Sequence, residues 1–182
     1  GPIPTVINVS GGKATKVTTY VGGSWRAGTG SVTDLGTVPA REAAAYLVAI
    51  AERGDAGGKD AVFAATLADS ADVWPGLLRI AKNGALPRET RKNAVFWLGQ
   101  AAGTAATASL DSIVGDPRGD RDVREAAVFA LSQRPRDEGV PALIRVARSD
   151  RDPDIRRKAI FWLGQSDDPR AIALFEELLT KR

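Results

Sequence analysis

The sequence predicts an all-α fold, a solenoid of stacked helix pairs, preceded by a short β-hairpin. Three observations lead to this expectation: a phrase that is repeated along the chain, a regular spacing between its copies, and a different composition over residues 1–38. At 182 residues, of which 43% are hydrophobic and 26% charged, the chain is long enough for one domain with a sizeable core.

Residues 1–38 are typical of a β-hairpin followed by a Gly-rich loop. Two runs rich in β-branched residues, TVINVS and KATKVTTYV, flank Gly11-Gly12, and such glycines supply the positive φ angles of a tight turn. The pair Gly1-Pro2 is typical of residues left after removal of an affinity tag. We therefore expect the native chain to carry an upstream segment, such as a signal peptide.

Residues 39–182 form the predicted solenoid. A helix is expected to begin just after Pro39, where AREAAAYLVAIAER has Ala and Leu at helical spacing. The repeated phrase is RKNAVFWLGQ (91–100), REAAVFALSQ (124–133) and RKAIFWLGQ (157–165), with DAVFAATLA (60–68) one period earlier. The segments between the copies repeat as well, as WPGLLRIAKN (74–83), SLDSIV (109–114), VPALIRVARS (140–149) and ALFEELL (173–179). Each period therefore holds two short helices, and such a unit buries its apolar face only by stacking on its neighbours.

The second helix of each unit resembles that of HEAT repeats of the bacterial, phycobilisome-lyase-like type, which follows roughly Val-Arg-x-x-Ala-x-x-x-Leu-Gly. Val123-Arg124 and Ile155-Arg156 occupy the Val-Arg positions, and Leu98-Gly99 and Leu163-Gly164 the Leu-Gly positions. The resemblance covers about residues 59–182 and implies a right-handed solenoid of about four HEAT-like helix pairs. It implies little about activity, because these repeats serve many partners.

The small and branched apolar residues of the phrase are expected in the core. Ala94 and Leu98 are four residues apart and so share one helix face, as do their counterparts in the later copies. The arginines at the Val-Arg position, Arg91, Arg124 and Arg156, are expected to bond the carboxylates of the turns at 120–122 and 152–154.

The phenylalanine of the phrase points the other way. Phe96 lies two residues from both Ala94 and Leu98, which places it about 200° around the helix, nearly opposite the core face. In proteins with the resembling repeats this face lines a concave surface, and aromatic residues bordered by amides suit a bound peptide. The expected partner-binding residues are Phe63, Phe96, Phe129, Phe161, Trp97, Trp162, Lys92, Gln100, Gln133 and Gln165. The alternative is that the phenylalanines bury against one another or beneath the hairpin.

The composition narrows the function classes. Cys and His are both absent, which excludes disulfides, thiolate and imidazole metal ligands, Cys nucleophiles and His-based triads. No apolar run approaches the length of roughly 18 residues that a membrane-spanning helix needs, so no span is expected. We expect a non-enzymatic scaffold, without catalytic residues, cofactor or metal, whose partner is another protein or a peptide. Its oligomeric state stays open, and the lack of Cys is compatible with a periplasmic location in a bacterium.

The alternative function is nucleic-acid binding, as in the HEAT-like alkylpurine DNA glycosylases. Trp97 and Trp162, with Lys92, Arg157 and Lys158, offer a partial likeness to their concave surface. The basic residues are interleaved with acidic ones throughout, however, and the excess of positive charge is only +3. A groove that follows phosphates needs a stripe of one sign, so the protein scaffold is preferred.

Overall fold

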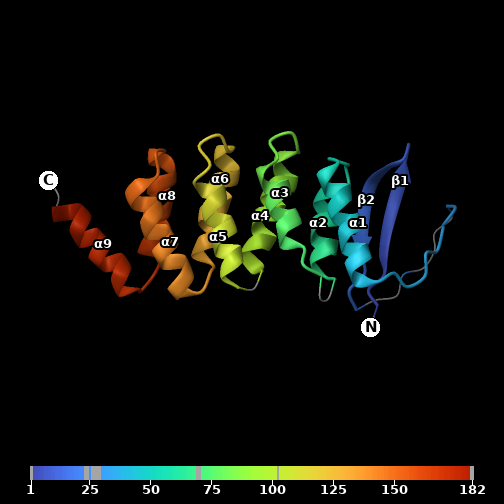
Figure 1. Ribbon diagram of the computed structural model, residues 1–182, viewed down its shortest axis with the longest axis horizontal. Coiled ribbons are helices and arrows are strands. Elements are labelled where there is room, and N and C mark those ends of the chain that lie inside the picture. The colour runs from blue at the N-terminus through green and yellow to red at the C-terminus, as the bar shows by residue number, and fades with distance from the viewer. Residues whose placement is uncertain (1, 23–24, 26–29, 69–70, 102, 181–182) are drawn as a thin grey trace.

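The computed structural model describes residues 2–22, 25, 30–68, 71–101 and 103–180. These described residues form a two-stranded antiparallel hairpin and nine helices, which follow one another along the long axis of the molecule (Figure 1). The elements are β1 (Thr5–Ser10), β2 (Lys13–Thr19), α1 (Ala40–Glu52), α2 (Gly58–Thr66), α3 (Trp74–Lys82), α4 (Arg88–Gln100), α5 (Thr104–Val114), α6 (Arg121–Ser132), α7 (Arg136–Ser149), α8 (Pro153–Gly164) and α9 (Pro169–Thr180). The expected hairpin and the predominance of helix are therefore confirmed, including the first helical residue after Pro39.

The hairpin turns at the two adjacent glycines. Gly11 and Gly12 have φ angles of +56° and +74°, the left-handed values that residues other than Gly rarely adopt. Part of the Gly-rich loop that we expected next, at 23–24 and 26–29, lies outside the described residues. The described remainder of the segment up to Pro39 contains no helix or strand.

The hairpin is attached to the first helices through β2, which packs on α2. Ala14 and Val17 of β2 are buried, and the backbone N–H of Ala14 donates to a carboxylate oxygen of Asp55 at 3.1 Å. In return Gly57 N–H donates to the carbonyl oxygen of Ala14 at 2.9 Å. A Cβ atom at Gly57 would lie 3.1 Å from the backbone of Lys16, so the strand can approach this loop closely because position 57 is Gly.

The helices pack in two rows. Each odd-numbered helix contacts the next odd-numbered helix, from α1 to α9, and each even-numbered helix contacts the next even-numbered one, from α2 to α8. Each even-numbered helix also packs on the odd-numbered helix before it. Between the rows lies the core, to which the phrase contributes fully buried residues at Ala94, Leu98, Ala127, Leu131, Ala159 and Leu163. The predicted register of the repeat is therefore confirmed; the outer surface of α2, α4, α6 and α8 is called the even-helix face below.

The arginines of the phrase connect neighbouring helices. Arg124 is buried and donates to both carboxylate oxygens of Asp150 at 2.8 Å, and Arg91 lies 3.5 Å from the carboxylate of Asp120. Both reach forward to the loop before the next even-numbered helix, as expected. The expectation is wrong for Arg156, which donates to the backbone carbonyl of Asp150 at 2.7 Å. The described chain has no even-numbered helix after α8, so no equivalent forward loop is present to supply a carboxylate.

Another buried arginine, Arg134 in the loop between α6 and α7, holds the start of α5 against the stack. Arg134 donates to the carbonyl oxygens of Ala101 at 2.5 Å and Gly103 at 2.8 Å. It also donates to the hydroxyl of Thr107 at 2.9 Å and to the carboxylate of Glu138 at 3.0 Å. One guanidinium thus connects backbone carbonyls between α4 and α5 with side chains of α5 and α7.

Candidate functional site

Three phenylalanines stand out from the even-helix face. Phe96, Phe129 and Phe161 expose 47%, 39% and 55% of their surface, whereas the alanine and leucine two residues away from each are fully buried. The angular prediction is therefore confirmed for these residues, and their burial against one another or under the hairpin is wrong. Phe63 differs, since it is only half-buried and lies beneath another aromatic ring.

Two tryptophans fill interfaces, here called seams, between neighbouring even-numbered helices. Trp97 lies in the seam between α2 and α4, and Trp162 lies in the seam between α6 and α8. The ring of Trp97 on α4 lies 5.2 Å from that of Phe63 on α2 and 5.1 Å from that of Phe96 on its own helix. Trp162 on α8 repeats this arrangement with Phe129 at 5.0 Å and Phe161 at 5.1 Å. Centroid separations of this size and edge-to-face or tilted rings are the favourable geometry for aromatic pairs. The face thus carries two aromatic triplets, each of which spans two helices.

The seam between α4 and α6 is built differently. Ala130 stands on α6 where α4 has Trp97 and α8 has Trp162. A Cβ atom at Gly99 would lie only 3.0 Å from the Cβ of Ala130, so small residues allow α4 and α6 to approach closely here. Large and small residues after the phenylalanine therefore alternate with a period of two repeats, which the sequence contains but which was not predicted from it.

The predicted polar residues lie along the two borders of the phenylalanine row. Gln100, Gln133 and Gln165 are all exposed, at or just beyond the C-terminal ends of α4, α6 and α8. Lys92 lies one turn before Phe96 and pairs with Glu89 at 3.6 Å. The structure thus gathers the predicted site residues on one face, with amides along one border and a cation on the other.

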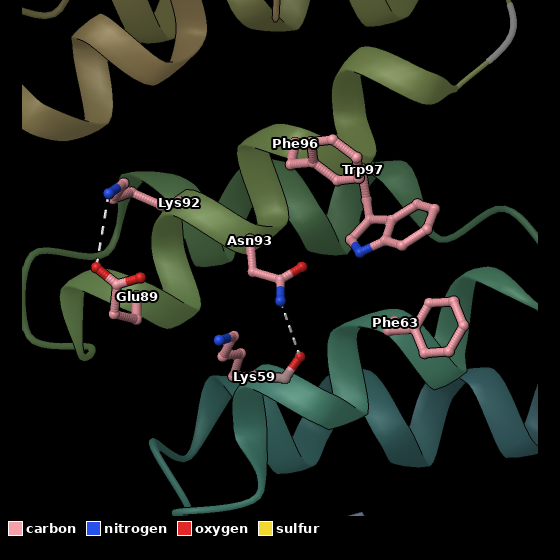
Figure 2. Close-up of a pocket in the computed structure, with 7 residues that line it drawn as sticks. All are labelled: Lys59, Phe63, Glu89, Lys92, Asn93, Phe96 and Trp97. Atoms are coloured by element: carbon pink, nitrogen blue, oxygen red, sulfur yellow. Dashed lines mark hydrogen bonds and ion pairs between the residues drawn. The ribbon is translucent and has the colours of Figure 1, made fainter. Parts of the chain in front are cut away.

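A groove runs between α2 and α4, with a volume of about 410 Å³. Figure 2 shows its three aromatic side chains at one end and its charged side chains at the other, with Asn93 between them. The amide of Asn93 donates to the backbone carbonyl of Lys59 at 3.4 Å. The lining residues are Lys59, Phe63, Glu89, Lys92, Asn93, Phe96 and Trp97. Lys59, Glu89 and Asn93 were not predicted, although Lys59 stands four residues before Phe63 as Lys92 stands before Phe96.

A related groove of about 340 Å³ lies between α6 and α8. Its aromatic end is formed by Phe129 and Trp162, which correspond to Phe63 and Trp97 two repeats earlier. Its polar end differs, because Glu125 and Lys158 form an ion pair at 3.1 Å within it. The two grooves share an apolar end and differ in charge.

In the described part of the chain, no group of three or more Asp or Glu residues is placed to hold a metal ion. No helix among the described residues is both long and apolar enough to cross a membrane.

Comparison with known proteins supports the class of fold. Residues 117–182, which contain α6 to α9, match the family model described as HEAT repeats. The chain matches none of the curated proteins and none of the solved structures with which it was compared. The C-terminal part is therefore similar to HEAT repeats, and the helices before it repeat its phrase and its packing.

Proposed function

We propose that this chain is a non-enzymatic scaffold that binds a segment of another protein on its even-helix face. The observation that carries the proposal is the row of exposed phenylalanines, Phe96, Phe129 and Phe161. Exposed aromatic rows favour aggregation unless a partner covers them, and buried aromatic anchors supply much of the affinity of protein interfaces. HEAT repeats commonly serve as protein-interaction scaffolds, which agrees with this assignment.

The proposal includes the finer features of the fold that the sequence predicts. The helices would form four pairs in a right-handed solenoid of the bacterial, phycobilisome-lyase-like type, with the even-helix face concave. A concave face would let the exposed glutamines at its border bond the backbone of an extended peptide while the rings bury its side chains.

The absence of catalysis is part of the same proposal. Asp55, Glu138 and Asp168 have pKa values below their ordinary range, because they accept hydrogen bonds from the Ala14 N–H, the Thr107 hydroxyl and the Arg170 guanidinium respectively. A general acid at neutral pH needs a carboxyl pKa that is raised instead. In the described residues, all the carboxyl groups whose pKa is displaced are displaced downward.

Nucleic-acid binding is not favoured by the charges. Most of the basic residues along the even-numbered helices are matched by acidic ones, as in the ion pairs of Arg88 with Asp122 at 2.6 Å and Arg121 with Asp154 at 2.7 Å. We expect no sub-micromolar binding of labelled duplex or single-stranded DNA at physiological salt. Sub-micromolar binding with a steep salt dependence would replace the scaffold proposal by the nucleic-acid alternative.

The direct test compares two surfaces of the molecule. The wild type, a Phe96→Ala/Phe129→Ala/Phe161→Ala variant, and a Tyr46→Ala control would each be used to capture partners from the native organism, followed by quantitative mass spectrometry. Tyr46 is 53% exposed but lies on α1, in the other row of helices. A true partner should be lost with the triple variant and retained by the control, since loss of one hot-spot ring alone costs about 2 kcal/mol, or roughly 30-fold in affinity.

Circular dichroism and thermal melts would first show that each variant is folded. If the captured proteins are the same for the wild type and the triple variant, the even-helix face is not the binding site.

A further inference from the structure

Building on the proposed function, we propose that the groove between α2 and α4 recognises an apolar–acidic motif in an extended peptide. An apolar or aromatic side chain of the partner packs against Phe63, Phe96 and Trp97. A carboxylate two residues away in the partner bonds to Lys59 and Lys92.

The apolar end of the groove is preformed. Trp97 is held between Phe63 and Phe96 at ring distances of 5.2 and 5.1 Å, so it presents a fixed edge to the groove. Figure 2 shows its indole nitrogen on the side of the ring that faces Asn93. Within the described chain this N–H donates to no protein group, which leaves it available to a backbone carbonyl of the bound peptide. The volume of about 410 Å³ suits one large side chain with its flanking backbone.

The other end of the groove has cations that the protein itself does not fully neutralise. Lys59 is exposed in the first turn of α2, and in the described residues no carboxylate lies within ion-pair distance of it. Among the residues that the structure describes, Lys92 pairs only with Glu89, at 3.6 Å, and the Glu89 side chain is 66% exposed. An exposed pair of this kind contributes little and is easily exchanged for another carboxylate. Figure 2 shows both lysines at the end of the groove away from the rings.

The spacing of the two ends matches an extended peptide. Lys59 and Phe63 are four residues apart on α2, as are Lys92 and Phe96 on α4, which corresponds to about 6 Å along a helix axis. In an extended chain, residues i and i+2 project from the same side and are about 6.6 Å apart. The motif is therefore an apolar residue, any residue, and Asp or Glu, in either direction along the peptide.

Comparison with the groove between α6 and α8 indicates how the lysines of the first groove set its preference for an acidic residue. The aromatic end of the groove between α6 and α8 has the counterparts of Phe63 and Trp97, but Glu125 occupies the position of Lys59 two repeats on, and Lys158 that of Asn93. Glu125 and Lys158 neutralise each other at 3.1 Å. The other two charged residues that line this groove are Asp122 and Lys92, of which Lys92 also lines the groove between α2 and α4, so the charges in the lining sum to zero. A carboxylate gains little there, so the preference for an acidic residue is a property of the groove between α2 and α4.

The test is a selection of random twelve-residue peptides displayed on phage against the immobilised full chain, with counter-selection on a Lys59→Glu/Lys92→Glu variant. We expect the enriched peptides to share Phe, Leu or Trp two residues from Asp or Glu. The affinity of synthetic copies, measured by fluorescence anisotropy, should fall at least tenfold with the double variant. It should change less than twofold with Lys158→Glu, the matched control in the other groove.

The other outcomes separate this inference from the proposed function. Enriched peptides without acidic residues, or with an affinity that the double lysine variant leaves unchanged, would overturn the inference. If such peptides are nevertheless weakened by Phe129→Ala, the scaffold proposal stands with a different specificity. If no peptide is enriched, the inference fails, and if enriched peptides are insensitive to Phe96→Ala, Phe129→Ala and Phe161→Ala alike, both proposals fail.

Discussion

Truncation of two side chains on α6 separates a surface role from a core role within one turn of helix. Leu131 is fully buried, so Leu131→Ala should leave a cavity and lower the free energy of unfolding by about 2–5 kcal/mol. Phe129 is 39% exposed, and its ring pairs with that of Trp162 at 5.0 Å. Removal of the ring opens a space that solvent can enter, so the loss is the aromatic pairing, about 0.5–1.5 kcal/mol, and a part of its apolar contact. We expect Phe129→Ala to cost about 1–2 kcal/mol in total, clearly less than Leu131→Ala.

Urea unfolding followed by far-UV circular dichroism would measure both free energies. Tryptophan fluorescence is unsuitable as the main probe, because Phe129 contacts Trp162 directly. The urea dependence should be the same for both variants and the wild type, since stacked repeats can lose two-state behaviour. If Phe129→Ala costs as much as Leu131→Ala, Phe129 is a packing residue and the site assignment fails. A cost below about 1 kcal/mol for Leu131→Ala would instead contradict the repeat register.

Three further predictions test the seams, the arginine between α6 and α7, and the last loop. Gly99→Ala should destabilise the fold by about 1–3 kcal/mol, because the new methyl group would lie 3.0 Å from Ala130. Gly164→Ala should be neutral or stabilise the fold by up to about 1 kcal/mol, because the nearest neighbour of its methyl group would be 4.0 Å away. The opposite ranking in urea unfolding would contradict the difference between the seams. Arg134→Lys should cost at least about 2 kcal/mol in the same assay, since an ammonium cannot reproduce the branched set of hydrogen bonds; a loss within error would show that these bonds are dispensable. The Asp168 pKa is lowered to about 2 in the folded chain, mainly by its hydrogen bonds from a neighbouring arginine side chain, and an unfolded Asp titrates at about 4. The contribution of this carboxylate to the free energy of unfolding is therefore complete above about pH 4 and is lost as the pH falls towards 2. The melting temperature of Asp168→Asn should fall less over this interval than that of the wild type. Equal slopes of melting temperature against pH would refute the assignment.

The features that the sequence predicted depend on residues near one another in the chain. Pro39 precedes the helix start at Ala40, and Gly11-Gly12 make the turn of the hairpin, because both are set by local backbone preferences. The exposure of Phe96 likewise follows from the angle between positions on a single helix.

The features that it did not predict depend on which distant segments meet. Phe63 was expected, like its counterparts, to bind a partner, and the sequence did not show that Trp97, from the next even-numbered helix, lies over it. Lys59 belongs to the groove because α4 lies beside α2, and Arg134 is buried because the start of α5 closes over it. In the sequence alone, both look like ordinary charged residues of a helix start and a loop.

The alternation of tryptophan and alanine after the phenylalanine has a consequence for how such a chain could be lengthened or shortened. A single inserted repeat would place two tryptophan-bearing helices, or two alanine-bearing helices, next to each other. If two tryptophan-bearing helices were neighbours, the seam between them would have to accommodate a second indole ring beside a phenylalanine that is now exposed. If two alanine-bearing helices were neighbours, the seam between them would have no aromatic ring to fill it. An insertion of two repeats, equal in length to the segment from Phe63 to Phe129, keeps large next to small throughout and adds one complete groove. The module that evolution or a designer can copy without repacking is therefore the double repeat.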